Sequence, residues 1–295
     1  MRIFVTGGTG FIGKFVIKKL NNGKNEILIL SRNSNKSIKS ENISFLKGNL
    51  ADINQWGKSL LEFKPEACVH LAWEGIPDYK IDNSIKNLKY GLDLMQLLVE
   101  SGCQKILATG SLWEYGSLKG RLSEDTPVNP FNAFTAAKNS LNWMGRELAK
   151  ENNMVFLWTR LFYVYGPGQK SDSLIPYLTR CAKENIKPEI RNPDARNDFI
   201  YIEDVAEAIY QILIKCKKSD LFNIGSGKSI KIQYIIKKIF QTLGIKKGYD
   251  IGEKDQPDSF QSSYAGISKI RKKTGWVPKI NIDEGIKRVL DFSLK

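Results

Sequence analysis

The chain has 295 residues, of which 42% are hydrophobic, so it can form one large core or two moderate ones. No apolar run approaches the roughly 20 residues of a membrane span, and residues 1–5 read as a strand with no leader in front, so we expect a cytoplasmic protein with no membrane partner. The formal charge of +14 is spread over every segment, which favours a lysine-rich solvated surface over a nucleic-acid-binding stripe. We therefore expect no nucleic acid, although the positive field favours an anionic ligand such as a nucleotide.

The cysteines and the single histidine argue against two kinds of site. Cys68, Cys103, Cys181 and Cys216 lie too far apart in sequence for a zinc site or a redox dithiol, and we expect no metal. His70 is the only histidine, so a Ser-His-Asp hydrolase is disfavoured. We interpret this imidazole as a satisfied side chain at the end of a strand.

The first half of the chain alternates strands with helices. We expect strands at 2–6, 26–31, 43–46, 67–71, 105–109 and 155–160, and helices at 11–20, 59–63, 81–101 and 132–150. This alternation implies right-handed crossovers and a parallel sheet covered on both faces. The fold class predicted is α/β, with a doubly wound Rossmann sheet.

Prolines become more frequent after residue 168, and the pattern of elements changes there. Further helices are expected at 174–184, 204–215 and 229–243. We place a dinucleotide-binding domain at 1–166 and a smaller, mainly C-terminal α/β substrate lobe at 167–295, with some of its segments returning to the first domain.

A glycine-rich loop follows the first expected strand. Gly7, Gly10 and Gly13 stand where a backbone must turn tightly, approach a pyrophosphate and pack a helix against a strand. The helix begins at Phe11 and Ile12, so its free amide groups and its dipole would meet the phosphate charge. The loop predicts a nicotinamide-dinucleotide site.

With this loop, further segments resemble the extended short-chain dehydrogenase/reductase family, which includes nucleotide-sugar epimerases, dehydratases and 4-ketoreductases. The matching segments, in the order of the family, are residues 48–52, 70–72, Asn87, 111–116, Lys138, 160–168, 198–205 and 275–278. Several motifs in the right order are far more specific than one, and they cover nearly the whole chain.

The resemblance implies further cofactor contacts. Asn49 and Leu50 should approach the adenine, although the family usually has Asp at position 49. Leu71 and Ala72 should line the dinucleotide cleft, and Asn87 falls at the asparagine that closes it.

The end of the second strand bears on the choice between NAD and NADP. NAD-preferring members place an acidic residue there to accept hydrogen bonds from the ribose 2′-hydroxyl. This chain has Ser31 and Arg32 instead, a hydroxyl and a planar cation that suit a 2′-phosphate. We expect NADP, with NAD as the alternative.

The catalytic set that the resemblance implies has one gap. The family uses a Ser/Thr, here Ser111, with a tyrosine that moves a proton and a lysine, here Lys138, that lowers the tyrosine pKa and binds the nicotinamide ribose. The tyrosine position is Phe134, which lacks the phenolic oxygen.

Three explanations of Phe134 compete. The chain is an engineered Tyr-to-Phe variant, a natural paralogue that binds without turnover, or an enzyme in which another group transfers the proton. The intact surroundings favour the first. Glu114 is a substitute only if it faces the pocket, and Tyr115 is interpreted as a structural turn residue.

The resemblance also implies a substrate site, formed by Trp73, Ser111, Leu112, Trp113, Tyr163 and Arg196. Relatives commonly carry Asn at position 163, and Arg196 is displaced by one residue from the arginine that grips the diphosphate. Dehydratases carry an Asp-Glu pair where Leu112 and Trp113 stand, so elimination of water is disfavoured.

These observations favour NADPH-dependent reduction of a 4-keto nucleotide sugar in bacterial surface-polysaccharide synthesis. An NAD-dependent 4-epimerase is the alternative enzyme, and a non-catalytic dinucleotide sensor or scaffold is the alternative from another class. The expected partner is a nucleotide-diphosphate sugar. The oligomeric state is open, with a homodimer as the candidate assembly.

Overall fold

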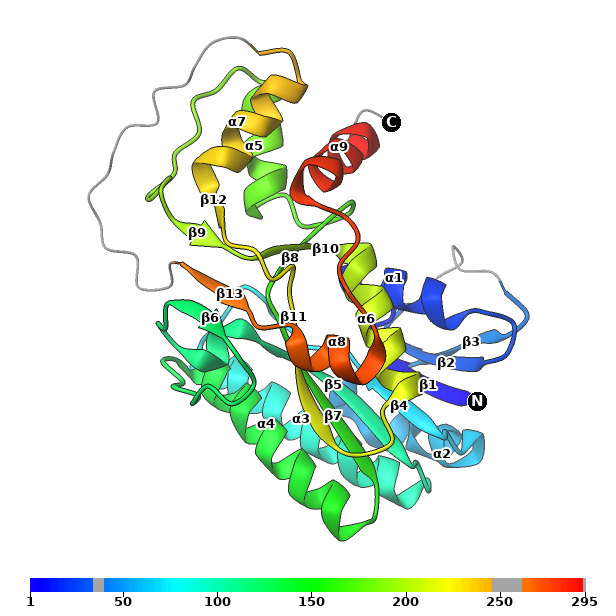
Figure 1. The fold of residues 1–295 in the computed structure, drawn as a ribbon. Coiled ribbons are helices and arrows are strands. Elements are labelled where there is room, and N and C mark those ends of the chain that lie inside the picture. The colour runs from blue at the N-terminus through cyan, green and yellow to red at the C-terminus, as the bar shows by residue number, and fades with distance from the viewer. Residues whose placement is uncertain (34–39, 246–261, 294–295) are drawn as a thin grey trace.

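The computed structural model describes residues 1–33, 40–245 and 262–293. Its centre is a seven-stranded sheet in the order β11-β7-β5-β4-β1-β2-β3, with every pair of neighbours parallel (Figure 1). The strands are β1 Arg2–Thr6, β2 Glu26–Ser31, β3 Ile43–Lys47, β4 Ala67–His70, β5 Lys105–Ser111, β7 Val155–Leu161 and β11 Asp220–Ile224. The predicted α/β fold with a doubly wound parallel sheet is confirmed.

Helices cover both faces of this sheet because alternate strand residues point to opposite sides. On β1, Ile3 and Val5 enter one hydrophobic cluster, and Phe4 enters another on the opposite face. The first face is covered by α1 Phe11–Leu20, α6 Ile202–Lys215 and α8 Ser268–Thr274. The second is covered by α2 Ile53–Phe63, α3 Ile81–Glu100 and α4 Ala133–Glu151.

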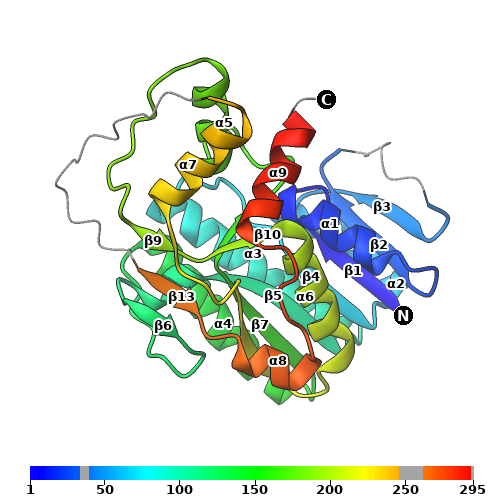
Figure 2. The ribbon, with the colours of Figure 1, turned by 45° about the horizontal axis from the view of Figure 1, so that its top comes forward.

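A smaller group of elements lies beyond the carboxyl ends of the sheet strands, where α5, α7 and α9 share a hydrophobic cluster of their own (Figures 1 and 2). These helices are α5 Leu174–Lys183, α7 Ile232–Thr242 and α9 Ile282–Ser293. Two small sheets connect them to the main sheet, in the orders β12-β9-β13-β6 and β10-β8. Their strands are β6 Gly120–Leu122, β8 Tyr163–Tyr165, β9 Arg196–Asn197, β10 Phe199–Tyr201, β12 Ile230–Lys231 and β13 Ser263–Ala265.

Some elements differ from the sequence-based expectations. Helix α2 begins at Ile53, six residues before the expected start, directly after the 3-10 turn η1 Leu50–Asp52 that the Asn49 side chain caps. The sequence did not predict β11, α8 or α9. Strand β11 joins the main sheet beside β7, so segments after residue 167 pack on both parts of the molecule. Within the described ranges, no helix is long and apolar enough to cross a membrane.

Buried Asp198 ties together segments that are distant in sequence. Its carboxylate accepts hydrogen bonds from the backbone N–H groups of Ser226, Gly227 and Ala265 at 2.6, 2.9 and 2.9 Å. It therefore joins the turn after β11 to strand β13.

The loop after β1 and the first turn of α1 pack too tightly to accept a side chain at one glycine each, Gly7 and Gly13. Gly7 has φ +71°, and a Cβ there would lie 2.7 Å from the backbone N of Ala72. A Cβ on Gly13 would lie 2.0 Å from the Gly7 carbonyl oxygen. At Gly10 the nearest atom would be the same oxygen at 3.2 Å, so this position is open on the side of the cleft.

Gly13→Ala should therefore destabilise the fold, and Gly10→Ala should cost much less. Because the Gly13 methyl would meet backbone that cannot rotate away, we expect a loss of about 3 kcal/mol, the upper end of overpacking costs. Urea unfolding of both variants beside the wild type measures this difference. Equal loss at both positions would contradict the packing described for this loop.

Candidate active site

A cleft of about 660 Å³ opens where the strand order reverses between β1 and β4, the place at which open α/β sheets bind ligands. Most of the expected cofactor residues line it, namely Gly7, Gly10, Phe11, Ile12, Gly13, Ser31, Arg32, Asn49, Leu50, Leu71 and Ala72. The fold therefore brings together residues from four separate strand ends.

The start of α1 fits the pyrophosphate of a dinucleotide. The N-cap, Gly10, makes no side-chain hydrogen bond to the helix, and the first turn holds no acidic residue. Phe11, Ile12 and Gly13 line the cleft, and N–H groups in a first helical turn have no partner within the helix. These donors and the helix dipole suit a phosphate, and the open side of Gly10 lets it approach the backbone.

At the end of β2, Arg32 is available to an anion. Its side chain is 75% exposed, and its guanidinium lies 3.8 Å from the carboxylate of Glu74, a distance at which an exposed ion pair contributes little. Ser31 Oγ donates to the Asn33 carbonyl oxygen at 2.7 Å. Glu74 also lines the cleft. It was not selected from the sequence, and its position shortly after β4 was the only signal that could have predicted its place in the cleft.

Asn87 does not line this cleft but fixes the loop that follows β4. Its Oδ1 accepts from the Glu74 N–H at 2.7 Å, and its Nδ2 donates to the carbonyl oxygens of Glu74 and Asn83 at 3.1 and 2.8 Å. The expected cleft-closing asparagine thus holds the cleft-lining backbone at Glu74.

Ser111 ends β5 and begins the 3-10 helix η2, which spans Leu112–Tyr115. Its hydroxyl accepts from the Trp113 N–H at 3.2 Å, and its own N–H donates to Glu114 Oε1 at 2.8 Å. This capping box sets the position of the Ser111 hydroxyl.

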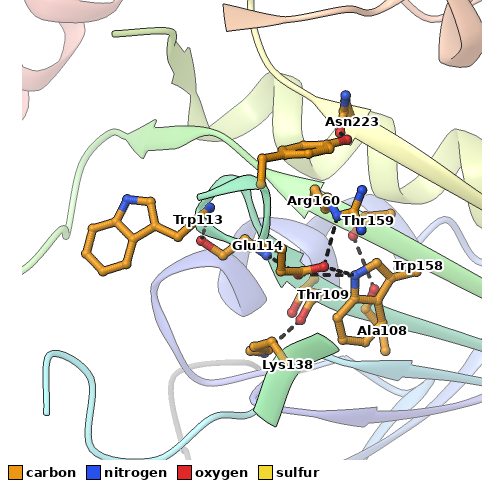
Figure 3. Close-up of polar contacts among 11 residues, drawn as sticks. Ala108, Thr109, Trp113, Glu114, Lys138, Trp158, Thr159, Arg160 and Asn223 are labelled. Carbon is orange, nitrogen blue, oxygen red and sulfur yellow. Dashed lines mark hydrogen bonds and ion pairs between the residues drawn. The ribbon is translucent and has the colours of Figure 1, made fainter. Parts of the chain in front are cut away.

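Glu114 is fully buried, and its carboxylate is already used within the protein (Figure 3). It accepts from Arg160 Nε at 2.9 Å and from Trp158 Nε1 at 3.1 Å, in addition to the Ser111 N–H. A carboxylate with these partners cannot exchange protons with a substrate, so the possibility that Glu114 is the base is not supported.

Tyr115 is also buried, and its hydroxyl is hydrogen-bonded within the protein. Its hydroxyl donates to Asn223 Oδ1 at 2.7 Å, and the Arg160 guanidinium lies 4.4 Å from the centre of its ring. Burial raises the pKa of Tyr115. These contacts support its sequence-based interpretation as a structural residue.

Lys138 lies one helical turn after Phe134 on α4 and is buried. Its Nζ donates to the Thr109 carbonyl oxygen at 2.7 Å (Figure 3) and lies 4.0 Å from the centre of the Trp73 ring. Burial lowers the pKa of Lys138 to about 7, against the opposing attraction of Glu114. Trp73 also lines the cleft between β1 and β4, so it connects the lysine with that cleft.

His70 is satisfied at the end of β4, as expected. Its Nδ1 lies 2.7 Å from Thr6 Oγ1. Burial, with a smaller contribution from Lys138, lowers the pKa of His70 to about 3, so the ring is neutral at physiological pH.

Phe134 lies within a group of aromatic rings. Its ring centre is 5.0 Å from that of Tyr79, 5.5 Å from that of Trp73 and 6.3 Å from that of Trp113. Tyr79 was not singled out in the sequence, because nothing in the order of motifs places the loop before α3 against α4. We call Trp73, Tyr79, Trp113 and Phe134 the aromatic cluster.

Of the other expected substrate residues, Tyr163 and Leu112 lie near Trp113, and Arg196 lies on the surface. Tyr163 accepts a hydrogen bond at its hydroxyl from Trp113 Nε1 at 3.4 Å, and Leu112 is buried in a hydrophobic cluster that Trp113 also contacts. Arg196 lies exposed on β9, where its Nη2 donates to the Ser229 carbonyl oxygen at 3.4 Å.

Removing the Lys138 charge should change how stability depends on pH. The pKa of this lysine falls from 10.5 to about 7 on folding, so between these values the unfolded chain binds more protons and this group makes stability rise with pH. Lys138→Met lacks that rise. From pH 7 upward, the Tm of the wild type minus that of Lys138→Met should therefore increase with pH. Lys150→Met, an exposed control on the same helix, should show the same pH dependence of Tm as the wild type. Parallel curves for wild type and Lys138→Met would show that the charge is not buried.

A profile of the NAD dependent epimerase/dehydratase family matches residues 3–225. The chain is 27% identical over 307 residues to the dTDP-4-dehydro-6-deoxyglucose reductase of Escherichia coli, covering 98% of this chain and 96% of that protein. It is 26% identical over 257 residues to the dTDP-6-deoxy-L-talose 4-dehydrogenase (NAD(+)) of Aggregatibacter actinomycetemcomitans, with 85% and 94% covered. The crystal structure of the UDP-glucose 4-epimerase of Thermotoga maritima with UDP-glucose has a similar fold, with a TM-score of 0.87, 23% identity and both chains fully covered. The family match extends over most of the sheet and its cleft, and the chain belongs to the NAD dependent epimerase/dehydratase family.

Proposed function

We propose that this protein reduces the 4-keto group of a nucleotide-diphosphate sugar with NADPH, as a step in bacterial surface-polysaccharide synthesis. The observation that carries the proposal is the end of β2, where Ser31 and Arg32 line the cleft and no carboxylate follows the strand directly. A hydroxyl and a guanidinium at this place suit the 2′-phosphate of NADPH. NADPH is the dinucleotide that a reductase oxidises in each turnover and then releases as NADP+.

We assign the following roles to residues of this chain. The N-terminus of α1 would hold the pyrophosphate, and Asn49 and Leu50 would border the adenine. Lys138 would bind the nicotinamide ribose if the Trp73 ring, now beside its Nζ, gives way. Ser111 would hold the sugar oxygen by its hydroxyl. When bound, the dinucleotide supplies the hydride.

The names of two relatives support chemistry at carbon 4. One is a reductase of a dTDP-4-dehydro-6-deoxy sugar, and the other a 4-dehydrogenase of a dTDP-6-deoxy sugar. The second name specifies NAD(+), so the names of these relatives do not decide between NAD and NADP. The proposal of NADP rests on Arg32.

Phe134 favours a second candidate, a protein that binds the dinucleotide without turnover. Without a phenol at this position, the family's own proton-transfer group is missing. In that case the aromatic cluster would close the cofactor site, and the protein would act as a sensor or scaffold.

Incubation with NADPH and a panel of 4-keto-6-deoxy sugars on dTDP, CDP, GDP and UDP separates these functions. The proposed reduction predicts loss of NADPH absorbance matched by an equal amount of the 4-hydroxy sugar. Inversion at carbon 4 of a 4-hydroxy sugar nucleotide, without net loss of NADPH, would identify an epimerase. Binding of dinucleotide without either reaction would identify the sensor or scaffold.

Arg32 should decide the cofactor preference. A charged hydrogen bond contributes about 1.5–3 kcal/mol, so Arg32→Ala should weaken NADPH binding about tenfold or more and leave NADH binding nearly unchanged. Calorimetric titration with both dinucleotides measures this, with Arg271→Ala on α8 as a control at an exposed arginine outside the cleft. Equal losses for NADPH and NADH would contradict a 2′-phosphate contact.

A further inference from the structure

Reduction of a ketone requires a proton for the carbonyl oxygen as well as a hydride for the carbon. Phe134 cannot supply that proton. Glu114 and Tyr115 are held in buried hydrogen bonds, and burial keeps His70 neutral and bound to Thr6. If the proposed reduction takes place, the proton must come from another group near position 134.

Tyr79 is a phenol beside this position. It lies on the loop between β4 and α3, four residues after Gly75, and its ring centre is 5.0 Å from that of Phe134 and 5.1 Å from that of Trp113. The same loop carries Trp73, which lines the cofactor cleft and contacts both Phe134 and the Lys138 ammonium. The phenol is thus on the same loop as a residue that lines the cleft and contacts the expected catalytic Lys138.

The Tyr79 hydroxyl is also uncommitted. Within the described ranges, it makes no hydrogen bond to another residue, in contrast to the hydroxyls of Tyr115 and Tyr163. The side chain is only partly buried, so water can return a proton to it between turnovers. Burial raises the pKa of Tyr79 above its ordinary value of 10, so the phenol keeps its proton at neutral pH.

We propose that Tyr79 is the general acid of the reaction, in place of the tyrosine that the family has at position 134. This inference rests on the proposed reduction. The dinucleotide would supply the hydride for the new C–H bond, its own C–H bond breaking to leave NADP+, while the π electrons of the carbonyl move to oxygen. That oxygen takes the proton of Tyr79, whose O–H bond breaks. The Tyr79 phenolate then takes a proton from solvent, so each reduction consumes one proton.

A double-mutant cycle tests the assignment, because Tyr and Phe have the same ring and differ by one hydroxyl. Tyr79→Phe should lower kcat by about 10²- to 10⁴-fold, the usual value of general acid catalysis. Adding Phe134→Tyr to that variant should restore most of the loss, because it returns a phenol to the position at which the family has one. Tyr90→Phe on α3 is the matched control and should behave as the wild type.

Two measurements without turnover accompany the cycle. Calorimetry with NADPH and with the product sugar nucleotide should give the same affinities for wild type and Tyr79→Phe, because the hydroxyl acts on the proton and not on binding. In the ultraviolet difference spectrum between these two proteins, the Tyr79 phenolate should form with a midpoint above 10, its ordinary pKa.

The outcomes separate the two proposals. Full activity in Tyr79→Phe would overturn the assignment of Tyr79 and leave the reduction intact, with the Lys138 ammonium as the remaining donor. Loss of activity together with lost affinity for the sugar nucleotide would also overturn it, because Tyr79 would then be a binding residue. No NADPH oxidation in the wild type or in Phe134→Tyr would contradict the reduction itself, and the assignment of Tyr79 would fall with it.

Discussion

The close approach of the first loop to the end of β4 is the constraint on which the site depends. Gly7 has no room for a Cβ, which lets the loop lie directly against Ala72, and Gly13 has none either, which lets the start of α1 pack against Gly7. The N-terminus of α1 consequently faces the same space as the loop after β4. That loop carries Trp73 and Tyr79, so one contact between two backbones positions both the expected phosphate-binding amides and the aromatic cluster.

A second, buried interaction fixes the other side of the site. The ion pair of Glu114 with Arg160 is fully desolvated, and such a pair is costly to break because it would leave one charge without a partner. Glu114 also accepts from the Ser111 N–H, and its charge opposes the fall in the Lys138 pKa. One carboxylate thereby acts on both of the family's catalytic positions that this chain retains. It does so as a structural charge, which explains why it cannot serve as the missing base.

The sequence was most informative where the pattern of a segment is local. Strand β1, the glycine loop and helix α1 were predicted to the residue, because a short apolar run, glycine spacing and helical periodicity all lie within residues 2–20. The family motifs also located the residues that line the cleft. Contacts between distant segments could not be read this way. The pairing of β11 with β7, the ion pair of Arg32 with Glu74 and the packing of Tyr79 on Phe134 depend on tertiary positions that no spacing records.

The central claim is that the glycine loop binds a nicotinamide dinucleotide in the cleft between β1 and β4. Calorimetric titration of NADPH into the wild type and into Gly10→Val tests it most directly, because Gly10 lines the cleft and a Cβ there would meet only the Gly7 carbonyl oxygen, at 3.2 Å. The account predicts binding to the wild type and none to a Gly10→Val protein that keeps its circular dichroism spectrum. Unchanged affinity in folded Gly10→Val would contradict it and place the dinucleotide elsewhere.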